Sequence, residues 1–501
     1  MTFPDSTSQI LSPVDHTVPK VYFTFYLSFF LDNPQAGVES IQKGLTTLVS
    51  RIPFLAKDVA PCSDENHDNV HCIQPPSAAS QFIPMLRIRY HLNESVRVMT
   101  DTASCTAVED LQFSKRYAPL PTVMNPKESQ PIIRFVANVM IDGVILGLSF
   151  NHMAADGTGI GEVLEILSRC CRNDYDPLSL HRLELQLRCQ LSSPSIAGKQ
   201  PLKNFSETYS KEGTFHCLAP DTWPTAITSM ASVLNTFRFK FTSQKAKMLK
   251  DVCTSILSQT DDASSKESPH FLSCNDVLTA LLTICLRQSQ GAKLRDDEDF
   301  TVAFVANVRS RMDPPWPDHY IGVLLTMVLV AQSSMVNLVD EQKASIAARD
   351  LGIDKDELVR ITNLAANMRQ KLLGVDDQYV RSLLAYMQQQ RDWSQMNIKG
   401  GDVSYSSIRH LKVYDLDFGP SLGKITDFRL YFALLDDFCL LLPAAPGGGD
   451  WDMQLSINPS HQQALMENGL FRWALSEYSS APGHDKESDH VRLPMAALGG
   501  V

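Results

Sequence analysis

A histidine and an aspartate form the pattern in this chain that is best suited to chemistry. His152 and Asp156 stand in a stretch of small residues and glycines, residues 151–159. The apolar run at residues 144–150 predicts a strand that ends just before the histidine, and residues 160–170 predict a helix. A histidine at a strand end can project its ring into a cleft, and this side chain is the best matched to proton transfer near neutral pH. The alternative is a histidine that only caps a turn.

The aspartate of this pattern needs a partner from elsewhere in the chain. Asp156 would order the loop by accepting a charge-assisted hydrogen bond from an arginine. Residues 301–308 predict a strand that runs into Arg309 and Arg311 and then into a proline-rich turn. Either arginine could supply the partner for Asp156. The alternative is a surface turn with two solvated arginines.

The start of an apolar helix near residue 273 is a second place where a ligand could bind. Residues 273–276 read Ser-Cys-Asn-Asp and lead into a run of apolar residues, which is typical of a helix N-terminus. Such a terminus offers free N–H groups and the positive end of the helix dipole to an anion. An ordinary helix cap is the simpler interpretation.

Length and composition indicate a soluble globular protein of two domains. The chain has 501 residues, more than a single core usually holds, with 44% hydrophobic and 20% charged residues. The net charge is -11 without a block of Lys or Arg, so nucleic-acid binding is not expected. The 11 cysteines are scattered and form no C-x-x-C pair, which predicts neither disulfides nor a metal site. Residues 1–20 lack the features of a signal peptide and residues 21–31 are too few to span a bilayer, so we expect a cytoplasmic protein without a membrane partner.

Hydrophobic periodicity predicts strands and helices on both sides of a long crossover. Strands are expected at residues 21–30, 84–91, 132–140, 144–150, 237–241, 301–308, 320–331, 428–435, 438–442 and 451–457. Helices are expected at residues 38–52, 161–172, 243–257, 466–478 and over most of 341–392. These elements predict a first domain at residues 1–190, a crossover at 191–225, a second domain at 226–480 and a flexible tail at 481–501.

Four short segments, taken in order, carry a resemblance to a known family. They are residues 152–157, 273–276, 307–315 and 417–419, with the sequences HMAADG, SCND, NVRSRMDPP and DFG. Together they resemble the motifs of the BAHD acyltransferases, particularly the fungal, trichothecene 3-O-acetyltransferase-like branch. Pro420 and Ser421 follow the DFG segment where plant members have Trp-Gly, so the chain is not close to the plant enzymes.

The resemblance implies a fold and a set of roles. The fold would be α/β (α+β), with two chloramphenicol-acetyltransferase-like domains, each a mixed β-sheet flanked by helices, and an active-site channel between them. His152 would be the general base. Asp156 would turn away from the chemistry and support the motif by pairing with an arginine, for which Arg309 is the first choice and Arg311 the second.

The resemblance also implies a site for coenzyme A. Ser273 and Asn275 would contact the phosphate or pantetheine side of the coenzyme. Asp417 and Gly419 would lie in a loop away from the histidine, with a structural role linked to coenzyme A binding. Acetyl-CoA or another acyl-CoA would be the co-substrate, and no permanently bound cofactor or metal is expected.

The predicted function is therefore an acyl-CoA-dependent O-acyltransferase, most simply an O-acetyltransferase, that acts as a monomer on a hydroxyl of a secondary metabolite such as a terpenoid, alkaloid or polyketide. His152 would accept the proton of the alcohol and return it to the departing thiolate. The chain contains no G-x-S-x-G segment, so an acyl-enzyme is not expected. The acceptor, the acyl chain length and the choice between oxygen and nitrogen stay open.

Two other functions compete with this prediction. A condensation-type domain would share the fold and the motif but join carrier-bound groups into amides. Such domains usually carry two consecutive histidines, whereas Asn151 precedes His152 here. The other alternative is a non-catalytic binding protein that has kept the fold.

Overall fold

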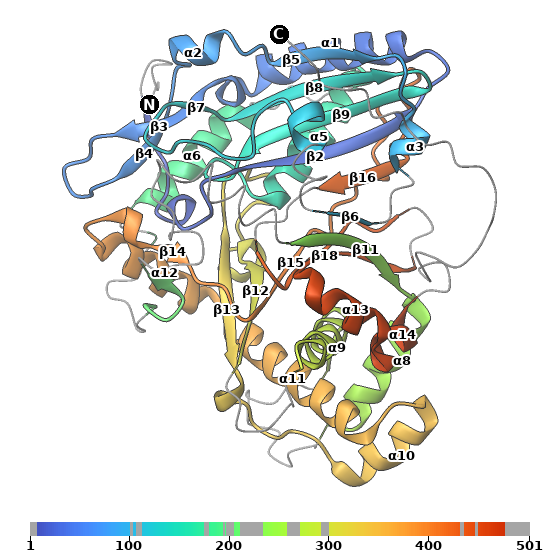
Figure 1. Ribbon diagram of the computed structural model, residues 1–501. Coiled ribbons are helices and arrows are strands. Elements are labelled where there is room, and N and C mark those ends of the chain that lie inside the picture. Colours follow the sequence, from blue (N-terminus) through green and yellow to red (C-terminus); the bar gives the residue numbers. More distant parts are fainter. Residues whose placement is uncertain are drawn as a thin grey trace, which may run out of the picture.

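The chain folds into two halves, each built on a mixed β-sheet, which lie one above the other in Figure 1. The structure is a computed structural model, and it describes residues 8–100, 104–106, 113–174, 180–193, 196, 205–210, 234–257, 271–291, 300–430, 435–445 and 449–475. The expected tail at 481–501 and most of the expected crossover at 191–225 lie outside these residues.

The sheet of the N-terminal half carries the candidate histidine. Its strand order is β16-β2-β9-β8-β5. The bounds are β2 (Tyr22–Phe30), β5 (Leu86–His91), β8 (Ile133–Met140), β9 (Gly143–Asn151) and β16 (Asp427–Leu430). Strand β9 runs antiparallel to both β2 and β8, and β5 runs parallel to β8. Every residue of β8 and β9 is buried, which explains their nearly unbroken apolar sequence.

Two helices, α1 (Pro34–Arg51) and α5 (Gly157–Cys171), pack against each other and support this sheet. In α1 the buried positions Val38, Ile41, Leu45 and Leu48 recur at helical spacing, as the sequence predicts. Asn33 accepts a hydrogen bond from the N–H of Ala36 and caps its start. The remaining elements of this half are β1 (Gln9–Ile10), η1 (Val14–His16), η2 (Pro53–Ala56), β3 (Asp58–Cys62), β4 (Val70–Gln74), α2 (Ala78–Gln81), α3 (Val96–Thr100), β7 (Gln130–Pro131) and α6 (Leu180–Ser192).

The C-terminal half holds a seven-stranded sheet in the order β13-β12-β15-β17-β18-β11-β6. The strands are β6 (Ser104–Thr106), β11 (Asn235–Phe241), β12 (Thr301–Asn307), β13 (Leu325–Ala331), β15 (Val403–Ser407), β17 (Phe438–Leu441) and β18 (Trp451–Ile457). The helices are α8 (Ser243–Ser255), α9 (Cys274–Ser289), η3 (Arg309–Arg311), η4 (Gln332–Ser334), α10 (Glu341–Leu351), α11 (Lys355–Leu373), α12 (Asp377–Gln389), η5 (Trp393–Gln395), α13 (Pro459–Glu467) and α14 (Gly469–Ala474). Helix α9 lies at the centre of the helices in Figure 1 and contacts α8, α11, α13 and α14.

Each half lends one edge strand to the sheet of the other. Strand β16, late in the chain, pairs with β2, and strand β6, early in the chain, pairs with β11. An arginine joins the two sheets at this exchange: Arg238 donates to both carboxylate oxygens of Asp452 at 2.8 and 2.6 Å and to Asp427 of β16 at 3.1 Å. The two halves are therefore bound by main-chain pairing as well as by side-chain packing.

Most of the predicted elements lie within a few residues of their expected places, with three differences. The strand expected at 320–331 begins only at Leu325, for a reason given with the site below. The last helix expected at 466–478 is broken at Asn468, whose side chain caps a separate helix, α14, while residues beyond 475 are outside the description. Within the expected crossover, β10 (Tyr209–Ser210) pairs with β14 (Asn397–Ile398), so this part is packed on the protein.

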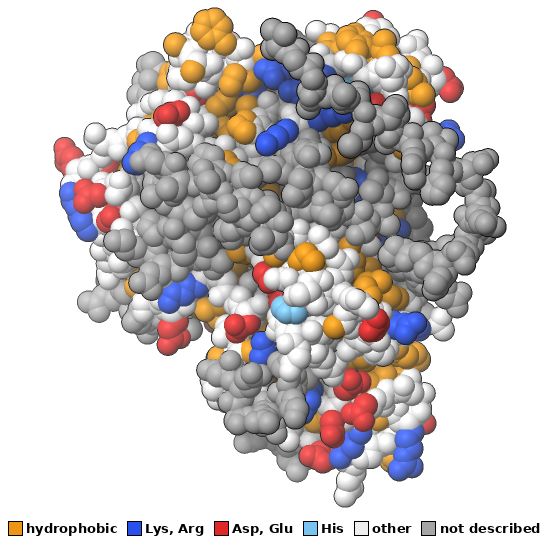
Figure 2. All heavy atoms as spheres, viewed as in Figure 1, with side chains coloured by type: hydrophobic (Ala, Val, Ile, Leu, Met, Phe, Trp, Pro, Cys, Tyr) orange, Lys and Arg blue, Asp and Glu red, His pale blue; other side chains and the backbone are white. Residues whose placement is uncertain are grey.

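The exposed face seen in Figure 2 carries acidic and basic side chains interspersed over the C-terminal half. Such mixing is typical of a solvated surface. In the part of the chain that the structure describes, no helix is both long and apolar enough to cross a membrane.

Candidate active site

His152 follows directly on the last residue of β9, where the chain leaves the sheet in a tight turn. The side chain of Asn151 accepts a hydrogen bond from the N–H of Met153 at 3.0 Å, and its carbonyl accepts one from Ala154 at 2.9 Å. The N–H of His152 donates to the carbonyl of Val21 at 3.1 Å, which ties the histidine to the start of β2. The backbone around the ring is therefore held on both sides.

The protonation of the His152 ring is set by one hydrogen bond. Its Nδ1 lies 3.0 Å from the carbonyl oxygen of Ala155. A carbonyl can only accept, so Nδ1 carries the hydrogen and Nε2 keeps its lone pair. The ring meets Phe23 edge to face, with centroids 4.8 Å apart. Burial lowers the pKa of His152 below its usual 6.5, against the opposing effects of the Ala155 carbonyl and the Asp156 charge. The ring is thus a neutral base at pH 7.

A cavity between the two halves of the chain opens on His152. One wall comes from the N-terminal half, with Phe23, Phe25 and Phe150 beside the histidine. The other comes from the C-terminal half. Its lining residues include Val305, Asn307, Leu325, Met327, Ser406, Ser407, Ile408, His410, Phe438 and Leu440. The walls are mostly apolar, so only a few side chains can form hydrogen bonds with a ligand in the cavity.

Asp156 forms a buried ion pair with Arg309. Arg309 Nη1 donates to Asp156 Oδ2 at 2.9 Å and Nη2 donates to Oδ1 at 3.0 Å. The same carboxylate caps α5 by accepting from the N–H of Gly159 at 2.9 Å, and it accepts from Leu324 at 3.0 Å. Each of its two oxygens accepts two hydrogen bonds, a geometry that suits a residue ordering the loop. Arg311 donates instead to the carbonyls of Leu372 and Val375 at 2.8 and 2.9 Å. The second choice for the partner of Asp156 is therefore wrong.

The segment 320–324 runs past this ion pair, and its backbone N–H and C=O groups form hydrogen bonds with side chains. Glu184 accepts from the N–H groups of Ile321 and Gly322 at 2.8 and 3.1 Å. Asp15 accepts from Val323 at 3.1 Å, and Arg309 donates to the carbonyl of Gly322 at 2.7 Å. Backbone groups engaged in this way cannot join a strand ladder, which explains why β13 starts only after residue 324.

Helix α6 also contacts the loop between β9 and α5, which follows His152. Arg188 on this helix donates to the carbonyl of Ala154 at 2.6 Å and forms an ion pair with Glu184 at 2.8 Å. The side chain of Arg188 is completely buried. The sequence analysis missed both residues, because a Glu-Arg pair four positions apart on a helix more often forms a solvated face.

The residues expected to contact coenzyme A lie in two separate places. Ser273 caps α9 in a capping box with Asp276, in which the Ser273 N–H and hydroxyl donate to Asp276 Oδ2 at 2.7 and 2.8 Å. Asp276 is held in turn by Arg369 at 2.5 Å. Asn275 lies in the first turn of the same helix. The simpler interpretation, a helix cap, therefore accounts for the contacts of Ser273.

Asp417 and Gly419 lie at the other end of α5 from His152. Asp417 accepts a hydrogen bond on its side chain from the N–H of Gly419 at 2.9 Å, and its carbonyl accepts one from Arg172, which follows α5. Helix α5 has 15 residues, so this loop is about 20 Å from the start of the helix at Asp156. Gly419 has a φ of +92°, which suits glycine. The structure thus places the DFG loop away from the histidine, as the sequence analysis expected.

Five polar residues that sequence reasoning did not single out also line the cavity. They are Thr158, Asn307, Ser406, Ser407 and His410. Thr158 lies in the stretch 151–159 and Asn307 in the segment 307–315, but the sequence assigned no role to either residue. His410 belongs to no recognisable pattern, and it reaches the cavity only because the fold brings residue 410 beside residue 158.

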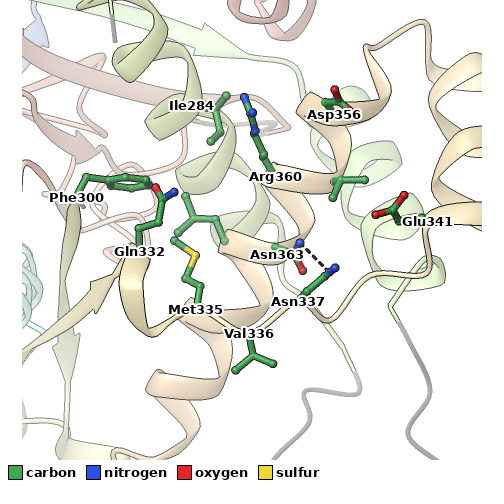
Figure 3. A pocket seen from close by; sticks show the side chains of 12 residues that line it. Ile284, Phe300, Gln332, Met335, Val336, Asn337, Glu341, Asp356, Arg360 and Asn363 are labelled. Carbon is green, nitrogen blue, oxygen red and sulfur yellow. Dashed lines mark hydrogen bonds between the residues drawn. The ribbon is translucent and has the colours of Figure 1, made fainter. Parts of the chain in front are cut away.

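A second cavity, which shares no lining residue with the first, lies among α9, α10 and α11 (Figure 3). Arg360, Glu341 and Asp356 surround it, and Asn363 donates to Asn337 at 3.1 Å on its rim. Its volume of about 540 Å³ exceeds the roughly 160 Å³ of the active-site cavity, yet its lining includes no histidine or cysteine. Chemistry rather than size therefore favours the cavity at His152. Among the described residues no group of His, Cys, Asp and Glu side chains could hold a metal ion.

Comparison with known proteins decides the family. The model of the Transferase family matches residues 94–469. The chain belongs to the Transferase family. Fumigaclavine B O-acetyltransferase easN of Aspergillus fumigatus is 34% identical over 496 residues, which cover 94% of this chain and 98% of that protein. O-acetyltransferase pyr7 of the same species is 30% identical over 487 residues, covering 95% and 94%. The predicted resemblance to BAHD acyltransferases is confirmed.

A solved structure shares the fold of this Transferase family member. The crystal structure of F. sporotrichioides TRI101 complexed with coenzyme A and T-2 superposes with a TM-score of 0.69 at 18% identity, covering 93% of this chain and 98% of that one. The predicted two-domain, chloramphenicol-acetyltransferase-like fold is therefore confirmed.

Proposed function

We propose that this protein transfers an acyl group, most simply acetyl, from a coenzyme A thioester to a hydroxyl of a secondary metabolite. The observation that carries the proposal is the state of His152. Its Nδ1 is bound to a carbonyl at 3.0 Å, so Nε2 is a base, and the ring opens into a cavity between the two halves. The names of the relatives, which include fumigaclavine B O-acetyltransferase, support an alcohol of secondary metabolism as acceptor.

The reaction follows from this geometry. The acceptor oxygen attacks the thioester carbonyl carbon as Nε2 of His152 takes the hydroxyl proton. The tetrahedral intermediate collapses, the C–S bond breaks, and the imidazolium returns its proton to the thiolate sulfur. A general base of this kind contributes roughly 10²–10⁴-fold, and holding both substrates in line supplies much of the rest. The apolar walls favour an acceptor with a largely hydrocarbon skeleton.

We place the anionic part of coenzyme A near the start of α9, where Ser273 and Asn275 lie. Burial raises the pKa of Cys274, the first residue of this helix, while the nearby cations Lys250 and Arg409 lower it and the carboxylate of Asp251 raises it. Cations and free N–H groups together favour a phosphate. The loop with Asp417 and Gly419 would act by fixing the end of α5 instead of by touching the coenzyme.

We propose further that one chain suffices for activity. Both walls of the cavity come from the same polypeptide, so no second copy is needed to complete it. Size-exclusion chromatography with light scattering should give a species of one chain, about 56 kDa, that is active in the same fraction. Activity confined to a larger species would contradict this.

The function is tested by acceptor-dependent release of free coenzyme A from acetyl-CoA, with terpenoid, alkaloid and polyketide alcohols and their amine analogues. His152→Ala should abolish the release, whereas His461→Gln, a histidine of α13 outside the cavity, should leave it unchanged. Transfer to the amine alone would favour condensation-type chemistry. No transfer by the wild type with several acyl-CoAs would favour a non-catalytic protein.

A further inference from the structure

A chain of hydrogen bonds leads from Asp156 back into the cavity. Arg309, which pairs with Asp156, donates through its backbone N–H to Asn307 Oδ1 at 3.0 Å. Asn307 Nδ2 donates to Thr158 Oγ1 at 3.2 Å, and Thr158 Oγ1 lies 2.9 Å from His410 Nε2. Thr158, Asn307 and His410 all line the active-site cavity. The buried ion pair is thus connected to a hydroxyl group that faces the substrates.

The orientation of the Asn307 amide is fixed by Arg309. Its oxygen accepts from the Arg309 backbone at 3.0 Å and lies 3.3 Å from Arg309 Nη1. An arginine has no acceptor, so this side of the amide must be the oxygen. The NH₂ group is therefore turned to Thr158, and it occupies one of the two lone pairs of the Thr158 hydroxyl.

His410 decides where the hydroxyl hydrogen of Thr158 goes. If Nε2 of His410 carries a hydrogen, it donates to the second lone pair of Thr158 Oγ1. Both lone pairs are then occupied and the hydroxyl hydrogen is left for the cavity. The same holds when His410 is protonated on both nitrogens. Only the opposite neutral tautomer would take the hydrogen of Thr158 for itself.

We infer that the Thr158 hydroxyl is a hydrogen-bond donor to the oxyanion of the acyl-transfer intermediate, and that Asn307 and His410 orient it. The inference rests on the proposed function. When the acceptor oxygen bonds to the thioester carbon, the carbonyl π electrons move to oxygen, and His152 takes the acceptor proton. Thr158 O–H stabilises the resulting O⁻ without losing its proton. When the C–S bond breaks, the carbonyl re-forms and His152 protonates the thiolate.

The place of Thr158 on α5 supports this role. It is the second residue of a 15-residue helix, so it lies at the positive end of the helix dipole. His152 lies on the same turn between β9 and α5, and both side chains reach the same cavity. A fixed donor at the point where negative charge develops is often the largest single contribution to acyl transfer. The inference also gives Asp156 a second task, because it holds Arg309 and hence the amide of Asn307.

The hydroxyl is tested by Thr158→Val, which keeps the shape of the side chain, and Thr158→Ser, which keeps the donor. Thr158→Val should lower kcat by roughly 10²–10³-fold with KM for both substrates nearly unchanged, and Thr158→Ser should recover most of the loss. Thr46→Val is the matched control, since this exposed threonine of α1 donates only to the carbonyl of Gln42 at 2.9 Å. If Thr158→Val does not fold, Thr158→Ala against Thr158→Ser isolates the hydroxyl.

Asn307 is tested as a positioning residue by Asn307→Ala alone and in the Thr158→Val background. The single variant should lower kcat, and in the double variant it should add nothing further, because there is no hydroxyl left to orient. A structural role would lower the rate equally in both backgrounds. His410→Ala, which removes the N–H donor, should likewise lower kcat in the wild type and add nothing further in the Thr158→Val background, and His410→Gln, which keeps a donor, should recover part of the loss.

The outcomes separate this inference from the proposed function. A wild type that transfers no acyl group would overturn both. An active wild type with Thr158→Val at the same kcat would overturn the oxyanion role alone. A Thr158→Val variant with a raised KM and an unchanged kcat would show that the hydroxyl binds the substrate in its ground state, which also contradicts the inference.

Discussion

Asp156 and Arg309, 153 residues apart in the chain, meet in a buried pair with two parallel hydrogen bonds of 2.9 and 3.0 Å. The pair joins the loop after β9 to the loop after β12, and so joins the two halves behind the cavity. Each exposes less than a twentieth of its side chain. Neither charge has water to replace a lost partner.

Removing one partner should therefore unfold the protein more easily. We expect Asp156→Ala to lower the free energy of unfolding by about 3–5 kcal/mol, because it leaves the Arg309 charge buried and unpaired. Urea denaturation followed by circular dichroism measures this. Asp68→Ala is the control, since Asp68 pairs with Arg391 on the surface, where both side chains are more than half exposed; it should cost less than about 1 kcal/mol. Equal effects of the two variants would contradict the structural role of Asp156.

His152 should behave in the opposite way. His152→Ala removes a base but no partner of a buried charge, so we expect kcat to fall by roughly 10²–10⁴-fold. The urea midpoint should stay close to that of the wild type, and the binding of coenzyme A, measured by calorimetry, should persist. A variant that keeps more than a tenth of the wild-type kcat would remove His152 from the role of general base.

The local part of this site could be predicted from the sequence. The strand before His152 and the helix after Asp156 follow from hydrophobic patterns of adjacent residues, and the arginine-bearing turn after β12 was recognisable in the same way. The choice between Arg309 and Arg311 was not decided by the sequence, because the two differ only in the direction their side chains take from a short 3-10 turn.

The long-range part could not be predicted. Residues 320–324 look like the start of a strand, because Ile321, Val323 and Leu324 are apolar. Their N–H groups instead donate to Asp15, Glu184 and Asp156, which lie 137 to 308 residues away in the sequence. Only the assembled fold shows that three carboxylates meet on one segment. The contact between Thr158 and His410, 252 residues apart, was hidden for the same reason.

The dependence of the rate on pH should report the environment of His152. Burial lowers the pKa of this ring below 6.5, so the neutral, basic form persists at pH 7 and is lost only as the pH falls through the lowered pKa. We therefore expect kcat/KM to be flat around pH 7 and to decline with an inflection below pH 6.5. The Asp156 charge raises this pKa, so in Asp156→Asn, measured on folded protein, the inflection should move to lower pH. An inflection above 6.5 in the wild type would contradict the assignment.

Gly159 gives a test of how tightly the two halves meet. A Cβ built on this residue would lie 1.9 Å from the carbonyl oxygen of Ile321, which is backbone and cannot move aside like a side chain. Gly159→Ala should therefore push segment 320–324 away from α5 and lower the free energy of unfolding by about 1–3 kcal/mol or more. The rate should fall as well, because Asp156 binds both Gly159 and Leu324. Gly469→Ala is the matched control, because a Cβ at this position in α14 would meet nothing within 4 Å. Thermal unfolding and kcat of the two variants decide the matter: if Gly159→Ala is as stable and as active as Gly469→Ala, the close approach of the two segments is not needed for the site.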